Sequence, residues 1–172
     1  MKKPAPVPQK PLPPKVEGPF ADMGLLPARV AAMRELILQA CESGEIERLR
    51  PAIERNETLP LFGKSGDRPR SFAVAIEFLR NKSFDGKGRE TLALLDAAAN
   101  APFATLTRGR SILYVWPALA VIDNPSPDEE ARLLRLRCTA FADLVTASAA
   151  NAPPVHRLEI GEDGTWHAFG TS

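Results

Sequence analysis

The chain has 172 residues, of which 44% are hydrophobic and 25% are charged, and its formal net charge is +1. This composition is sufficient for one domain with a hydrophobic core and excludes wholesale disorder. Residues 1–19 hold four Lys and one Glu, a net charge of +3, whereas the remainder holds 18 basic and 20 acidic side chains. A folded part that is neutral to acidic argues against nucleic-acid binding, so we expect no nucleic-acid partner.

Residues 1–19 contain seven of the 17 Pro, mixed with Lys. Such a segment buries little apolar surface and favours extended polyproline II, which predicts a disordered tail followed by one folded domain over residues 20–172. The tail could be a spacer, a docking peptide or simply an unstructured end. Its Met-Lys-Lys start runs at once into Pro without the apolar stretch of a signal peptide. Read literally, this predicts a cytoplasmic protein, unless a signal was removed upstream.

No transmembrane segment is predicted. The longest apolar run, residues 112–122, contains a Pro and is 11 residues long, whereas a membrane-spanning helix needs about 20 residues.

The first half of the folded part has the apolar spacing of helices. Ser43 and Gly44 end the first periodic stretch, and Pro51 must start a new helical turn or kink the second. Four helices are expected, at residues 26–43, 45–56, 72–84 and 89–99.

A glycine-rich turn precedes the fourth predicted helix. Gly86 and Gly88 flank Lys87, and Arg89 follows. Backbone amides at a helix N-terminus could hold an anion together with Lys87 and Arg89. The spacing of a P-loop is absent, and a plain glycine turn is the alternative interpretation.

Two β-hairpins and a long helix are predicted for the second half. Residues 103–107 and 111–116 flank a turn at Arg108-Gly109. Ser126, Pro127 and Glu129 then form a helix start with a capping box, and the wide apolar face that follows predicts one long helix. The expected fold class is α+β: a helical N-terminal half, then two hairpins in an antiparallel sheet of about four strands packed by the long helix.

The last hairpin has the clearest pattern. Residues 162–164 predict a turn with Gly in the left-handed conformation. The register derived from it places Ile160 opposite Trp166, Glu159 opposite His167 and His156 opposite Gly170, with Leu158, Ile160 and Trp166 in the core. Glu159 and His167 are therefore the catalytic candidates, as an acid–imidazole pair, although a solvent-facing cross-strand ion pair is the simpler interpretation. The two His lie on opposite faces, so no metal site is expected.

Three aromatic residues near the sheet, Tyr114, Trp116 and Trp166, are candidate ligand-binding residues if one sheet face stays uncovered. Core packing is the alternative. Cys41 and Cys138 are either two buried free thiols or one disulfide in an oxidising compartment. No CxxC occurs, and no cofactor is expected.

Several segments in order resemble a family of uncharacterised, mainly alphaproteobacterial proteins. They are LRPAIERN at 49–56, DGKGRE at 85–90 followed by LALL at 92–95, LYVWP at 113–117 and EDGTWHAF at 162–169. The resemblance covers roughly residues 28–170. Members carry a signal peptide and are regarded as periplasmic, and no activity is assigned to them, so the resemblance provides no catalytic residues. The chain departs from the family pattern at 118–122 and 149–154, where the family has aromatic or acidic residues.

The resemblance implies a non-catalytic periplasmic or envelope domain that binds a peptide, glycan or protein partner. A small hydrolase-like enzyme using Glu159 and His167 is one alternative. A cytoplasmic interaction protein that docks through its Pro-rich tail is another.

Overall fold

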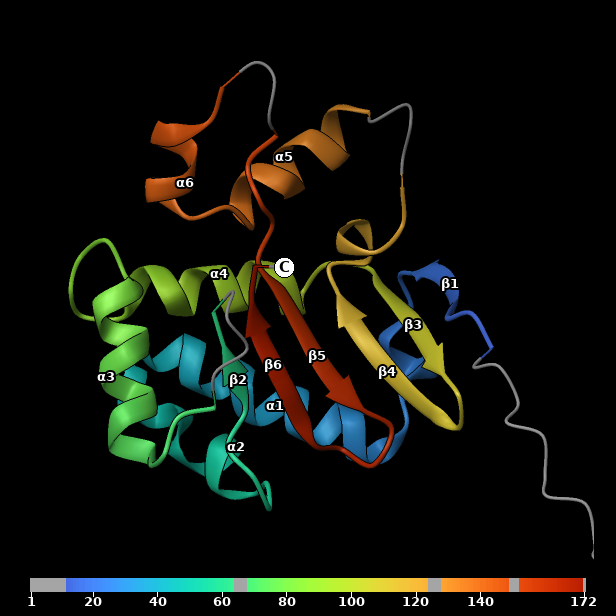
Figure 1. Cartoon of the computed structure of the whole chain (residues 1–172), viewed down its shortest axis with the longest axis horizontal. Helices are drawn as coiled ribbons and strands as arrows, with labels where there is room; N and C mark the ends of the chain where they lie inside the picture. The colour runs from blue at the N-terminus through green and yellow to red at the C-terminus, as the bar shows by residue number, and fades with distance from the viewer. Residues whose placement is uncertain (1–11, 64–67, 124–127, 149–151, 172) are drawn as a thin grey trace, which may run out of the picture.

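The computed structural model describes residues 12–63, 68–123, 128–148 and 152–171. The α+β class is confirmed: helices pack on one face of a mixed six-stranded sheet (Figure 1). The sheet order is β1-β3-β4-β5-β6-β2. The strands are β1 (Lys15–Phe20), β2 (Leu61–Phe62), β3 (Phe103–Arg108), β4 (Ser111–Trp116), β5 (Arg157–Gly161) and β6 (Trp166–Gly170). The α-helices are α1 (Ala28–Ser43), α2 (Arg50–Glu54), α3 (Phe72–Lys82), α4 (Arg89–Ala99), α5 (Glu129–Arg137) and α6 (Phe141–Thr146).

Both predicted hairpins form, but the sheet is larger than the expected four strands. The two additional strands lie at its edges, where β1 pairs antiparallel with β3 and β2 pairs parallel with β6. Residues 15–19 were expected in the disordered tail and instead belong to β1, because they pair along β3 and Phe20 packs against the core. Proline is tolerated in an edge strand because its missing N–H removes no bond from the ladder. Residues 1–11 of the predicted tail lie outside the described residues.

Three of the predicted N-terminal helices, α1, α3 and α4, are confirmed, whereas the helix predicted over 45–56 is divided into a 3₁₀ turn and the five-residue α2. Gly44 ends α1 in the left-handed conformation with φ +69°, and α2 begins at Arg50, one residue before Pro51, after a short 3₁₀ turn over Ile46–Leu49. Between α3 and α4, Gly88 has φ +90°, and a Cβ there would lie 2.7 Å from Cβ of Ile46. Glycine at this position therefore allows α4 to approach the second helical segment closely.

The core lies between the helices and the sheet. Its largest fully buried side chains come from α1, the 3₁₀ turn and α2, α4, and four strands. They are Val30, Met33, Ile37, Ile46, Leu49, Ile53, Leu95, Phe103, Trp116, Leu158, Ile160 and Trp166. The predicted core residues of the last hairpin are thus confirmed.

The predicted long helix is wrong, because the structure has two short helices, α5 and α6. The break falls at Cys138–Ala140, where the N–H of His156 donates to the Cys138 carbonyl at 2.7 Å and Ala140 is extended. Asp128 caps α5 by accepting from the N–H of Ala131, whereas the predicted cap at Ser126 and Pro127 lies outside the described residues. In Figure 1, α5 and α6 lie together beyond α4 at one end of the sheet.

The turn of the last hairpin is confirmed, with Gly164 at φ +86°, and Ile160 faces Trp166 as expected. The rest of the predicted register is wrong, because Glu159 faces Ala168 and Arg157 faces Gly170. His167 is the extra residue of a β-bulge. This bulge turns both Trp166 and Phe169 towards the helices, where they are 0% and 3% exposed.

Candidate ligand-binding site

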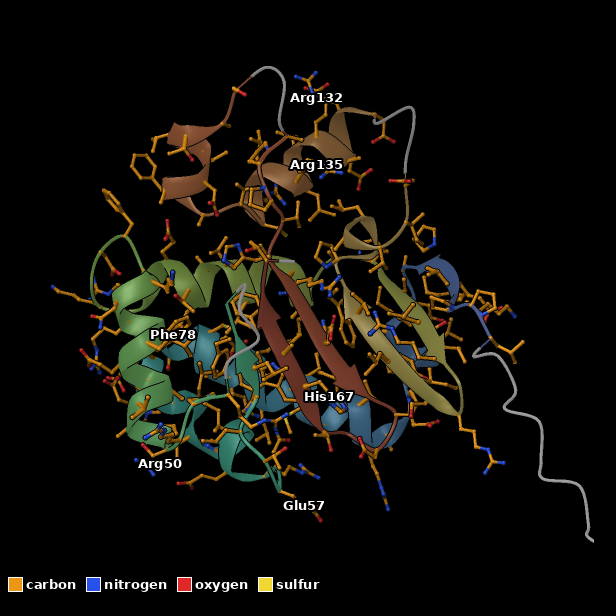
Figure 2. All side chains as sticks on the ribbon, viewed as in Figure 1. Arg50, Glu57, Phe78, Arg132, Arg135 and His167 are labelled. Carbon is orange, nitrogen blue, oxygen red and sulfur yellow. The ribbon has the colours of Figure 1, made fainter. Side chains whose placement is uncertain are left out.

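The structure does not form the predicted Glu159–His167 pair. Oε1 of Glu159 instead lies 2.9 Å from Nε of Arg157. His167 is exposed, and Figure 2 shows it near the turn of the last hairpin. The two residues therefore lack the arrangement of an acid–base pair.

The three aromatic candidates do not line one groove. Trp116 and Trp166 are 0% exposed and pack in the core against Phe103 and Phe62, with ring centroids 5.6 and 5.5 Å apart. Only Tyr114 borders a hollow, a cavity of about 280 Å³ beside β1 and β3. Burial is the main cause that raises the pKa of Tyr114, and the nearby charge of Glu162 adds to it.

The glycine turn before α4 holds an anion of its own. The carboxylate of Asp85 accepts from the Ser83 hydroxyl and from the N–H of Lys87, and the hydrogen bond from Ser83 is the main cause that lowers the pKa of Asp85. The Ser83 hydroxyl in turn accepts from the N–H of Glu90. Lys87 and Arg89 are exposed. The turn therefore behaves as the plain glycine turn that was the alternative interpretation.

Cys41 and Cys138 are free thiols, so the possible disulfide is not formed. Burial raises the pKa of Cys41 to about 12, with a contribution from Asp96, and burial raises the pKa of Cys138 to about 11. Both thiols stay protonated at neutral pH and are poor nucleophiles.

A larger cavity lies where α3, α4 and α6 meet the end of β6, and no sequence motif points to it. We call it the α6 cavity; its volume is about 450 Å³. Most of its wall is apolar. It is lined by Gly63, Phe78, Leu79, Lys82, Thr91, Leu94, Ala140, Ala142, Asp143, His156, Phe169, Gly170 and Thr171.

Buried side chains form the inner wall of the α6 cavity. Leu79 of α3, Leu94 of α4 and Phe169 of β6 are each no more than 5% exposed. At the side, β2 and β6 approach so closely that a Cβ on Gly170 would lie 2.8 Å from the backbone N of Gly63. The inner wall is therefore part of the packed body of the domain.

Two contacts fix the outer wall, which α6 provides. One carboxylate, Glu90, accepts the N–H of Phe84 through Oε1 at 3.1 Å and the N–H of Phe141 through Oε2 at 3.0 Å. This carboxylate ties the start of α6 to the loop between α3 and α4. The hydrogen bond from His156 to Cys138 ties the turn before α6 to the segment entering β5.

His156 is one of the polar residues that line the α6 cavity. Its ring lies 5.5 Å from that of Phe169, and its Nδ1 is buried without a hydrogen-bond partner. Burial lowers the pKa of His156 and outweighs the nearby carboxylates of Asp143 and Glu90, which raise it. The ring is therefore neutral at pH 7, and because Nδ1 is buried, a ligand could meet only Nε2.

The hydroxyls of Thr91 and Thr171 both line the α6 cavity. A nucleophilic hydroxyl must be activated by a base within hydrogen-bond reach, and the hydroxyl of Thr91 already donates to the Leu79 carbonyl at 3.0 Å. Within the described residues, no group of three or more His, Cys, Asp or Glu side chains could hold a metal ion. None of the described helices combines the length and apolar character needed to cross a membrane.

Comparison with known proteins gives no further guide to the site. No family model matches the chain, and no curated protein or solved structure matches it either.

Proposed function

We propose that the protein is a non-catalytic binding module that takes a small molecule, or the end of a peptide, into the α6 cavity. The observation that carries this proposal is the cavity itself, a hollow of about 450 Å³ with an apolar wall and a few polar groups. Ligand sites of proteins are typically concave, mainly apolar and roughly 300–1,000 Å³ in volume.

The side chains of the cavity wall indicate which class of ligand the cavity favours. Phe78, Leu79, Leu94 and Phe169 offer aromatic and aliphatic surface, which favours an apolar side chain over a sugar. Of the peptide, glycan or protein partners implied by the family resemblance, a peptide end or a small molecule of similar chemistry fits best. A periplasmic location rests on that resemblance alone and stays a prediction.

Filling the cavity tests the proposal. Ala142 lines the cavity and is exposed, so Ala142→Trp should block the entrance without disturbing the core. We expect fragments found by an NMR screen of the wild-type protein to bind this variant at least about tenfold more weakly, a change of about 1.4 kcal/mol.

Ala73→Trp is the matched control, because Ala73 is exposed on α3 and does not line the cavity. The proposal fails if the fragments bind both variants equally well, or if none of them shifts a resonance of the cavity wall.

A further inference from the structure

Two opposite charges line the α6 cavity without pairing with each other. Lys82 stands at the end of α3, with Nζ 5.6 Å from the centroid of the Phe78 ring, and Asp143 lies on α6. No ion pair of either residue occurs among the residues that the structure describes. Lys82 is exposed and Asp143 half-buried, so both charged groups belong to the outer part of the cavity.

This arrangement discriminates between classes of ligand. A ligand with a single charge would be attracted by one of the two groups and repelled by the other, which has the same sign. A ligand that carries both charges gains from both groups, and it gains more than in bulk water because the partly enclosed cavity screens charges less. Neutral His156 can add a hydrogen bond through Nε2 to either end.

We propose that the α6 cavity binds a small zwitterion with an apolar side chain, an amino acid or a short peptide. Its carboxylate lies towards Lys82, its ammonium group lies towards Asp143, and its side chain packs against Leu79, Leu94 and Phe169. This assignment rests on the proposed function and names the ligand class for the same site.

The test compares ligands that differ by one charge. Phenylalanine and the dipeptide glycyl-phenylalanine carry both charges, 3-phenylpropanoate lacks the ammonium group, and 2-phenylethylamine lacks the carboxylate. Isothermal titration at pH 7.5 should show at least one zwitterion binding about tenfold or more tightly than either singly charged analogue. If phenylalanine binds more tightly than glycyl-phenylalanine, the ligand is a free amino acid. If glycyl-phenylalanine binds more tightly, the ligand is a short peptide.

Variants assign each charge to its partner. Lys82→Met should weaken binding of the zwitterion about tenfold and leave binding of 2-phenylethylamine unchanged or tighter. Asp143→Asn should also weaken binding of the zwitterion about tenfold and leave binding of 3-phenylpropanoate unchanged or tighter. Lys87→Met and Glu57→Gln are matched controls on exposed residues outside the cavity, and they should change nothing. Glu57 lies at the end of the molecule opposite α5 and α6 (Figure 2).

The outcomes separate the two proposals. Equal binding of the zwitterions and their singly charged analogues, or no effect of either variant, overturns the zwitterion assignment while the binding module stands. If no zwitterion binds but neutral fragments still do, the assignment is again overturned alone. If Ala142→Trp abolishes the binding of none of these ligands, both the zwitterion assignment and the binding module are overturned.

Discussion

His156 is a half-buried polar residue of the α6 cavity, and the charges of Asp143, Glu90 and Lys82 lie near enough to influence its own. A buried nitrogen without a hydrogen-bond partner costs about 1–3 kcal/mol, and the Nδ1 of His156 is such an atom. The ring packs on Phe169, and the backbone N–H of His156 donates to the Cys138 carbonyl. Because His156 also lines the α6 cavity, its ring is a candidate for ligand contact.

The lowered pKa of His156 predicts a pH dependence of stability. Burial moves its pKa below the ordinary value of 6.5, so the unfolded chain binds the proton more tightly than the folded protein. The stability contributed by neutral His156 is present above pH 6.5 and is lost as the pH falls from there through the folded-state pKa. Urea unfolding at pH 7.5 and 5.0 should show a smaller loss of unfolding free energy for His156→Phe than for the wild type.

If His156→Phe loses as much stability between the two pH values as the wild type, the half-buried neutral ring of His156 is not the cause.

At the scale of elements, the side chain of Asn56 stabilises the bulge in β6 by making the backbone hydrogen bonds that a neighbouring strand would otherwise make. The Asn56 amide donates to the Trp166 carbonyl at 2.8 Å and accepts from the Trp166 N–H at 3.0 Å. Beyond the bulge, β2 takes over the pairing at Ala168 and Phe169. Asn56 therefore seals the part of the β6 edge that β2 does not reach.

Removal of this amide should destabilise the domain. Asn56→Ala leaves a partly buried N–H and carbonyl without partners, so we expect a loss of about 1–3 kcal/mol in the free energy of unfolding. Asn81→Ala, which removes an exposed side-chain hydrogen bond to Glu77, should cost less than about 0.5 kcal/mol. Equal effects of the two substitutions in urea unfolding would contradict the sealing role of Asn56.

Elements defined by local patterns could be predicted from the sequence, and elements defined by distant partners could not. The helices α1, α3 and α4 follow their apolar period and their Gly or Ser boundaries. By contrast, β2 is two residues long and exists only through β6. The helix predicted after Ser126 is interrupted because the Cys138 carbonyl bonds to His156, 18 residues further along the chain.

The bulge did leave a signal in the sequence. Trp166 and Phe169 are three residues apart, and strict alternation cannot turn both towards the same face of a sheet. Taking both as core residues would have required an extra residue between them, which is His167, and would have excluded its pairing with Glu159.

At the scale of the whole molecule, the candidate site exists only through the fold. The cavity wall combines residues from α3, α4, α6 and β6, which bring together side chains as distant as Phe78 and Thr171. Such a set of residues has no fixed spacing in the sequence. The aromatic candidates Trp116 and Trp166 are instead fully buried in the core. Of the polar cavity residues, the sequence pattern singles out only His156, and only as a possible metal ligand.

The two histidines of the chain provide the most direct test of the α6 cavity as the binding site. In a titration of the ¹⁵N-labelled protein at constant pH with phenylalanine or a fragment from the screen, ring-nitrogen NMR signals report on each histidine separately. We predict a saturable shift of the His156 ring signals, while those of exposed His167, near the turn of the last hairpin, stay in place. Binding that leaves His156 unchanged, or that shifts His167 instead, would contradict the assignment of the site.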